Sequence, residues 1–106
     1  MIMLDKDTFQ KEVLEASQPV LVDYFGDGCV PCAELLPSIE ALEEQYGDKI
    51  AFTKLNTTKA RRLAISQRVL GLPTVILYHG GEKVGECIKE EATKENIQAM
   101  IDSFLG

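Results

Sequence analysis

Residues 20–25 read V-L-V-D-Y-F, an apolar run interrupted by one aspartate and bounded by Pro19 and Gly26. Branched and aromatic side chains favour strands, and an apolar run without polar alternation indicates a strand buried on both faces. Such a strand needs other layers of structure against it. The run therefore predicts an α/β fold in which residues 19–25 form a strand inside a sheet.

The rest of the chain alternates between helical and strand patterns. Apolar periodicity predicts helices at residues 9–17, 32–47, 59–69 and 93–105. Apolar runs predict further strands at residues 49–56, 74–79 and 82–90. The expected order is α, β, α, β, α, β, β, α. We expect the first strands to pair in parallel and the last two to form an antiparallel hairpin at an edge.

A few residues mark where these elements start, bend and turn. Asp7 or Thr8 is expected to cap the first helix, and Thr93 the last. Pro37 falls inside the second helix and should kink it. Gly80-Gly81 should form the hairpin turn between the last two strands.

Size and composition indicate one domain covering residues 1–106, because 106 residues is near the commonest domain size. The chain is 45% hydrophobic, enough for a core without disulfides, so its cysteines need another explanation. Neither a signal peptide nor an apolar run of roughly 20 residues is present. We expect a cytoplasmic monomer without membrane partners, in which a C-x-x-C pair is redox-active or metal-binding.

The charge distribution bears on the partners. A formal net charge of −6 disfavours nucleic acid as a partner. Residues 49–81 contain no acidic residue, whereas they hold Lys49, Lys54, Lys59, Arg61, Arg62 and Arg68. This basic segment is interpreted either as a solvated helix face or as a docking patch for an acidic partner.

The pair Cys29 and Cys32 follows the buried strand and stands where a helix begins. Free N–H groups and the dipole at a helix N-terminus stabilise a thiolate, which lowers the pKa of the first cysteine below about 8.5. Pro31 suits the first helical turn, where a missing N–H has no consequence. We predict that the Cys29 thiolate attacks a partner's disulfide and that Cys32 then resolves the mixed disulfide.

Asp23 is the one charged residue of the buried strand. Desolvation should raise the pKa of its carboxyl group, which suits a general base that takes the proton of Cys32. The alternative is that Asp23 ends a shorter strand and faces water.

A zinc site is the alternative reading of the cysteines, with the donor set Cys29, Cys32, His79 and Cys87. His79 ends its strand six residues after Pro73, roughly 20 Å away at about 3.3 Å per residue. A second C-x-x-C is also absent. We therefore expect no metal, and interpret His79 as an exposed residue at a strand end.

Cys87 lies on the last predicted strand. Alternation puts Val84 and Ile88 on one face and Lys83, Cys87 and Lys89 on the other. Cys87 is therefore predicted to face solvent. We interpret it as a bystander thiol, with a regulatory or dimer-forming thiol as the alternative.

Several motifs occur in an order and at spacings typical of one family. They are V-L-V-D-Y-F-G-D-G-C-V-P-C at 20–32, Pro37, K-L-N at 54–56, G-L-P-T at 71–74 and G-G-E-K-V-G at 80–85. In these motifs the chain resembles the thioredoxin family over essentially its whole length. The resemblance implies a thioredoxin fold, with a central mixed sheet of parallel strands and an antiparallel C-terminal hairpin, flanked by four helices.

The resemblance also implies roles for single residues. Cys29 corresponds to the attacking and Cys32 to the resolving cysteine, and Asp23 to a buried acid behind the second cysteine. Lys54 corresponds to the lysine beside that acid, and Pro73 to a cis-proline that faces the cysteines.

Substrate contacts are implied for Gly28, Val30, Pro31, Leu72 and Thr74. The implied partners are disulfide-containing client proteins and a thioredoxin reductase or an equivalent electron donor. The Cys29–Cys32 pair takes the place of a cofactor.

Departures from the family pattern fall on the partner-binding surface. Phe25 and Gly28 stand where the family has tryptophans, Val30 replaces a glycine, and Ala33 replaces a common lysine. Residues 87–95 form a loop that is one residue longer and lacks the usual glycine. We expect an open, less apolar rim around Cys29, with consequences for partner range and redox potential.

Three functions follow from these patterns. The first is a general protein-disulfide reductase. The second is a dedicated electron carrier for one enzyme system, because the G-C-V-P-C variant resembles thioredoxins that serve glycine-reductase-type complexes in amino-acid-fermenting anaerobes. The third is a binding subunit with incidental cysteines, which the joint presence of Cys29, Cys32, Asp23, Lys54 and Pro73 argues against.

Overall fold

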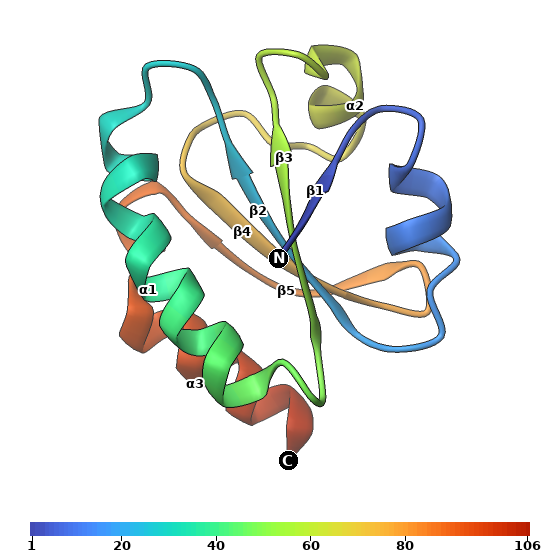
Figure 1. Cartoon of the computed structure of the whole chain (residues 1–106), viewed down its shortest axis with the longest axis vertical. Helices are drawn as coiled ribbons and strands as arrows, with labels where there is room; N and C mark the ends of the chain where they lie inside the picture. Colours follow the sequence, from blue (N-terminus) through green and yellow to red (C-terminus); the bar gives the residue numbers. More distant parts are fainter.

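A five-stranded mixed sheet forms the centre of the computed structural model, which describes residues 1–106. The strand order is β1-β3-β2-β4-β5. The strands are β1 (Ile2–Leu4), β2 (Val20–Phe25), β3 (Ala51–Asn56), β4 (Thr74–His79) and β5 (Glu82–Ile88). Both β1 and β2 run parallel to β3, whereas β4 is antiparallel to β2 and β5 (Figure 1). The expected mixed sheet with an antiparallel edge hairpin is confirmed.

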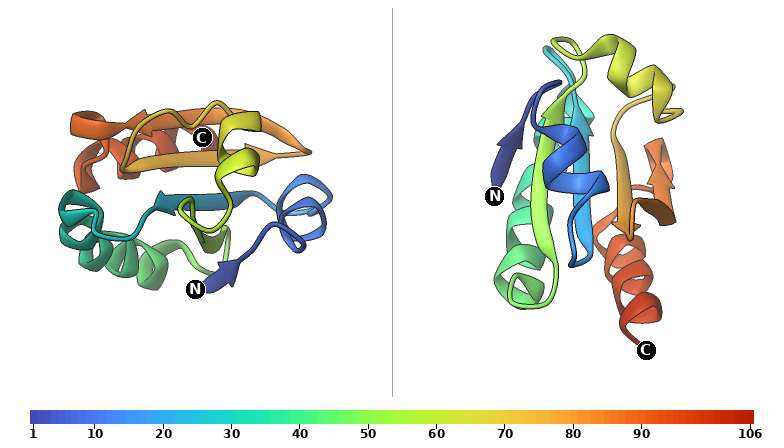
Figure 2. Two further views of the ribbon diagram at one scale, coloured as in Figure 1. Left: turned by 90° about the horizontal axis from the view of Figure 1, so that it is seen from above. Right: turned by 90° about the vertical axis from the view of Figure 1, so that its right-hand side faces the viewer.

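Four helical segments flank the sheet, as expected. They are the π-helical turn η1 (Gln10–Leu14) and the α-helices α1 (Val30–Tyr46), α2 (Arg61–Ser66) and α3 (Lys94–Leu105). A further 3₁₀ turn, η2 (Lys89–Glu91), follows β5, so the strand predicted over residues 82–90 ends at Ile88. One apolar core lies between the sheet and α1 with α3, and a second lies between the sheet and η1 with α2 (Figures 1 and 2). Thus β2 is buried on both faces, as its apolar run predicts.

The strand β1 was not predicted, so the expected order that begins with a helix is wrong. Only Leu4 of its three residues is buried, so the segment carries no periodic pattern. The strand β1 is defined by its backbone pairing with β3, which runs from Ile2 opposite Thr53 to Leu4 opposite Leu55. A strand defined in this way leaves little local signal in the sequence.

Caps and turns agree with expectation except at the first helix. The Asn96 N–H donates to Thr93 Oγ1 at 3.1 Å, which confirms the cap of α3. Neither Asp7 nor Thr8 caps the first helix with its side chain. Instead, their N–H groups donate to Asp5 Oδ1 at 2.8 and 2.9 Å, so an earlier aspartate arranges the turn.

The turn between β4 and β5 is also as predicted. Gly80 and Gly81 have φ values of 63° and 81°, the left-handed conformation that a two-residue hairpin turn requires and glycine adopts without strain. Pro37 lies inside α1.

The predicted faces of β5 are reversed. Cys87 is 6% exposed, whereas Val84 is 45% and Ile88 is 38% exposed, so the prediction of a solvent-facing Cys87 is wrong. The reason is the close approach of α3. A Cβ atom at Gly85 would lie 2.8 Å from Met100 Sδ, so a larger residue does not fit at this inward position. Gly85 and Cys87 therefore face the core, and the larger apolar side chains face outward.

Candidate active site

The cysteine pair sits where β2 passes into α1. Cys29 is the N-cap of α1, with extended backbone, and its Sγ accepts a hydrogen bond from the Cys32 N–H at 3.3 Å. The two cysteines form a disulfide across a Cα–Cα distance of 5.3 Å. Pro31 stands in the first turn of the helix, where its missing N–H needs no partner.

Burial distinguishes the two sulfur-bearing residues. Cys29 is half-buried, whereas Cys32 is 5% exposed and belongs to the core. Val30, between them, is 65% exposed and projects outward. A partner that approaches the surface therefore reaches Cys29 before Cys32.

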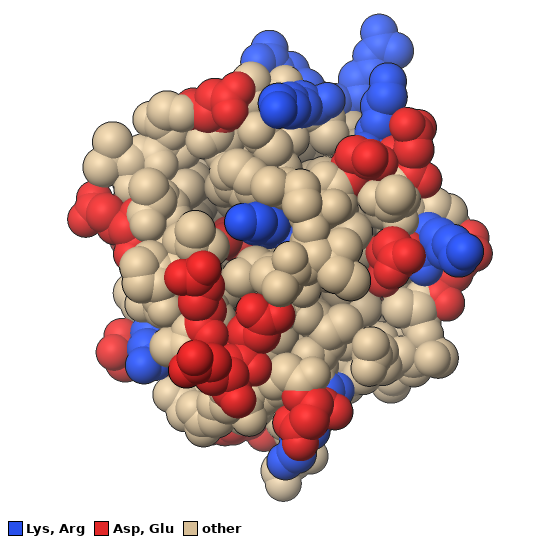
Figure 3. All heavy atoms as spheres, viewed as in Figure 1, with Lys and Arg blue, Asp and Glu red and all other residues tan.

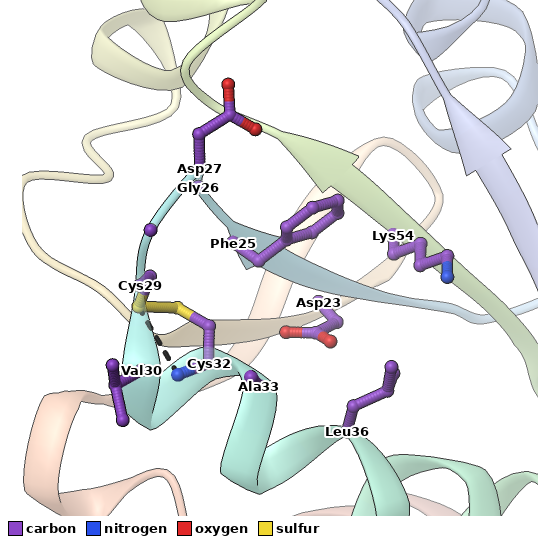
Figure 4. Close-up of a pocket in the computed structure, with 11 residues that line it drawn as sticks. Asp23, Phe25, Gly26, Asp27, Cys29, Val30, Cys32, Ala33, Leu36 and Lys54 are labelled. Carbon is purple, nitrogen blue, oxygen red and sulfur yellow. Dashed lines mark hydrogen bonds between the residues drawn. A yellow bond between two sulfur atoms is a disulfide. The ribbon is translucent and has the colours of Figure 1, made fainter.

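Asp23 lies in the middle of β2 and is 2% exposed, which rules out the alternative that it faces water. Its Oδ1 atom has no hydrogen-bond partner. Burial raises the pKa of this carboxyl group from 3.8 to about 7, and the positive charge of Lys54 opposes the rise. Figure 4 shows the carboxylate directed toward Cys32, with Lys54 on the neighbouring strand.

A cavity of about 460 Å³ connects these groups. Asp23, Lys54 and both cysteines line it, and Phe25 and Leu36 supply apolar wall (Figure 4). The cavity therefore brings the buried carboxyl group, the lysine and the disulfide to one space.

Gly28 stands at the rim of this cavity with φ at +71°, a conformation that L side chains rarely adopt. A Cβ atom there would meet nothing within 4 Å. The rim is open, as expected. It is not poor in apolar groups, however, because Phe25, Val30 and Leu36 line the cavity.

The segment before β4 forms the other side of the site. The Leu72–Pro73 peptide bond is cis, as the family resemblance implies. Leu72 lies beside the redox cavity, since a Cβ atom at Gly26 in its lining would be 2.9 Å from Leu72 Cδ1. Pro73 and Thr74 are buried and do not line the cavity, and the Thr74 hydroxyl donates to the Gly71 carbonyl at 2.7 Å.

Comparison with known proteins decides the family. A sequence model of the family Thioredoxin matches residues 1–103. The chain belongs to the thioredoxin family. It is 59% identical over 106 residues to the thioredoxin of Peptoclostridium acidaminophilum, covering 100% of this chain and 96% of that protein.

Other thioredoxins align over similar lengths of this chain. The thioredoxin of Acetoanaerobium sticklandii is 51% identical over 105 residues, which is 99% of this chain and 100% of that protein. Thioredoxin X, chloroplastic, of Arabidopsis thaliana is 36% identical over 97% of this chain and 57% of its own length.

Family membership and the Cys29–Cys32 disulfide together make this thioredoxin-family chain a disulfide oxidoreductase. Proteins of the thioredoxin family need no cofactor beyond the redox-active disulfide, and the family implies disulfide-bearing clients and a thioredoxin reductase. No helix in this thioredoxin fold has the length and apolar character to cross a membrane.

The residues of the zinc alternative do not come together in this thioredoxin fold. No group of three or more His, Cys, Asp or Glu side chains could hold a metal ion. His79 is exposed, and its ring packs edge-on against Phe104 with 5.3 Å between ring centroids. Cys87 lies in the apolar core beneath α1 and α3.

Sequence reasoning misses Lys89, which lies at the site because its N–H donates to the Pro73 carbonyl at 2.7 Å. Its backbone has φ at +53°, and its side chain lies over Gly71, where a Cβ atom would clash with Cε. The missing glycine in residues 87–95 is the only sequence signal that points to it.

Proposed function

We propose that the chain reduces disulfides of partner proteins through a mixed-disulfide intermediate. In the dithiol form, the Cys29 thiolate attacks one sulfur of the partner disulfide, and the other partner sulfur leaves and takes a proton from solvent. The Cys32 thiolate then attacks Cys29 Sγ and releases the second partner thiol. Two electrons pass to the partner, and the oxidised Cys29–Cys32 pair remains.

The observation that carries this order of attack is the difference in burial between a half-buried Cys29 and a core Cys32. Thiolate character at Cys29 has a second support. The hydrogen bond from the Cys32 N–H, 3.3 Å from Cys29 Sγ, stabilises negative charge on that sulfur at the start of α1.

Asp23 is proposed as the general base for the second step. A pKa of about 7 means that its carboxylate accepts a proton near neutral pH. The proton of Cys32 would pass to Asp23 within the cavity that both line, and from there to solvent. Lys54 keeps the Asp23 pKa from rising further.

Client binding is proposed for the surface around the disulfide. We expect the client to contact Gly28, Val30, Pro31 and Leu72, next to Pro73, with Thr74 behind this contact surface. Val30 and Pro31 are exposed, whereas Thr74 is buried and would act by positioning the Gly71 carbonyl. A thioredoxin reductase or an equivalent donor would restore the dithiol.

A dedicated electron carrier for one enzyme system, such as a glycine-reductase-type complex, is the second candidate. The observation that favours it is the open rim at Gly28, which offers a partner room to insert its own side chains. Efficient reduction of the chain by thioredoxin reductases from unrelated species would count against this candidate.

We further propose that residues 1–106 work as one domain and as a monomer in the cytoplasm. A dithiol that donates electrons needs a reducing compartment to return to its reduced form.

Trapping of the mixed disulfide tests the proposed order of attack. Reduced Cys32→Ser protein, mixed with disulfide-intact insulin, should accumulate a species with the mass of the protein plus insulin, because a second disulfide still joins the two insulin chains. Cys29→Ser, the matched control, should accumulate far less. Equal trapping by both variants would contradict the assignment of Cys29 as the attacking residue.

A further inference from the structure

The helix α2 and its connections carry exposed cations without internal partners. Lys59, Arg61, Arg62 and Arg68 are all exposed, and the one ion pair of the structure joins the N-terminal amine to Glu43. Figure 3 shows Lys and Arg side chains gathered at the top of the molecule, over α2 and the segment between β3 and α2. This cluster of positive charge stands out on a chain of net charge −6.

Exposed apolar side chains lie among these cations. Leu70 is 84% exposed, the highest value among the large apolar residues, and Ile65 is 57% exposed. Both line a cavity of about 280 Å³ together with Arg61 and Leu72. An apolar centre bordered by charged groups is the usual anatomy of a protein interface.

Arg68 adds a conformational argument. Its φ of 60° lies in the left-handed region at the end of α2, a place where glycine is the common residue. A glycine would adopt this backbone conformation without strain, yet the chain has an arginine at the position. This choice is consistent with a function for the positive charge.

The α2 cavity and the redox cavity share a wall. Gly26 lines the redox cavity, and a Cβ atom there would lie 2.9 Å from Leu72 Cδ1 and 3.2 Å from Thr58 Oγ1, both in the lining of the α2 cavity. The one acidic group at this boundary, Asp27, accepts a hydrogen bond from Asn56 Nδ2 at 3.0 Å. A partner engaged at Cys29 therefore lies within reach of α2.

We propose that this surface docks the disulfide-bearing partner protein through an acidic segment that carries one large apolar side chain. We define the α2 surface as Lys59, Arg61, Arg62, Ile65, Arg68 and Leu70. The apolar side chain would enter the α2 cavity, and the acidic groups would face the unpaired cations, which speeds encounter. This inference rests on the proposed reductase function and adds the chemistry by which the partner is selected.

A protein fits this surface better than a nucleic acid. The cavity wall is aliphatic, with Ile65, Leu70 and Leu72, and offers no aromatic ring on which bases stack.

The test compares two synthetic peptides that differ only in charge. Each has one leucine and one cysteine joined by a disulfide to 2-thiopyridine, and the flanking residues are glutamates in one and lysines in the other. Released thiopyridone gives the second-order rate constant with the reduced protein. At low salt the wild type should react at least about tenfold faster with the acidic peptide, an advantage that high salt removes.

Charge reversal assigns the effect to the α2 surface. The double variant Arg61→Glu with Arg68→Glu should lose the preference for the acidic peptide. Its matched control is Lys11→Glu with Lys49→Glu, which makes the same change of net charge at exposed positions outside the α2 surface and should keep the preference. Equal peptide rates in the wild type, or equal loss of preference in both double variants, would overturn the proposal.

The remaining arms separate docking from chemistry. Leu70→Ser should slow the acidic peptide by about tenfold through loss of the apolar contact, and an unchanged rate would remove Leu70 from the docking surface. Bis(2-hydroxyethyl) disulfide, small and uncharged, should be reduced at the wild-type rate by the charge-reversed variant, so that a docking failure is distinct from failure of the reductase function. Competition by a single-stranded oligodeoxynucleotide would overturn the assignment to a protein partner.

Discussion

Asp23 on β2 stands directly opposite Lys54 on the parallel strand β3, and both border the cavity that reaches the disulfide. The carboxyl group is almost fully buried, and one of its oxygens has no hydrogen-bond partner. A lysine in the neighbouring register position offsets part of the desolvation but leaves the pKa raised to about 7. The pair therefore keeps a proton acceptor of near-neutral pKa behind Cys32.

The raised pKa of Asp23 predicts a pH-dependent stability. The folded state binds this proton more tightly than the unfolded state, so the free energy of unfolding should fall as pH rises from the unfolded pKa of 3.8 to about 7. Asp23→Asn removes this pH-dependent loss of stability. Above neutral pH the oxidised variant should therefore be more stable than the oxidised wild type, by at most about 4 kcal/mol. Urea unfolding across this pH range measures the difference. A stability gap that does not change with pH would contradict the raised pKa.

The same variant tests the proposed base. Asp23→Asn should slow resolution by Cys32 and prolong the mixed disulfide, while the first attack by Cys29 keeps its rate. Rapid acid quench and mass analysis follow the intermediate. If the variant resolves the mixed disulfide at the wild-type rate from about pH 6 to about pH 9, Asp23 takes no part in the proton transfer.

Gly28 predicts a backbone effect that must be separated from a shielding effect. Because φ is +71°, Gly28→Ala and Gly28→Trp should each lose about 1 kcal/mol of stability. Only the tryptophan can fill the open space beside Cys29, so only that variant should change the Cys29 pKa and the rate with clients. Identical Cys29 reactivity in the two variants would show that the open rim has no bearing on the sulfur.

Lys89 predicts a contrast between two small substitutions. Both Lys89→Gly and Lys89→Ala remove the side chain over Gly71, but only glycine relieves the backbone at φ +53°. The free energy of unfolding of Lys89→Gly should therefore be about 1 kcal/mol higher than that of Lys89→Ala. Thermal and urea unfolding measure this, and an alanine variant of equal or greater stability would argue against strain at Lys89.

Cys87 predicts an unreactive thiol. Burial raises its pKa, and the charges of Glu91 and Glu86 raise it further. In a protein with Cys29→Ser and Cys32→Ser, iodoacetamide should label Cys87 slowly under native conditions and rapidly in urea. Labelling of the folded protein at the rate of the unfolded one would support a regulatory or dimer-forming thiol.

Local patterns predicted most of the redox site. The apolar run around Asp23 and the two-residue spacing of the cysteines act over a few residues, so their physical consequences are visible in the sequence. The helix α1 begins at Val30, two residues before the predicted start at residue 32. The side chains that line the redox cavity around them, such as Phe25 and Leu36, follow once β2 and α1 are placed.

Features set by distant contacts were not predictable in this way. The strand β1 exists through its pairing with β3, and Cys87 turns inward because α3 crosses β5 beside Gly85. Lys89 reaches the site through a backbone hydrogen bond to Pro73, which periodicity does not reveal.

The central claim is that the dithiol of Cys29 and Cys32 passes two electrons to a protein disulfide. Insulin reduction with dithiothreitol as the electron source tests it most directly, because precipitation of the freed insulin chain reports cleavage. The wild type should shorten the lag before precipitation, and Cys29→Ser should leave it at the value without protein. Equal acceleration by the wild type and Cys29→Ser, or no acceleration by the wild type, would contradict the claim.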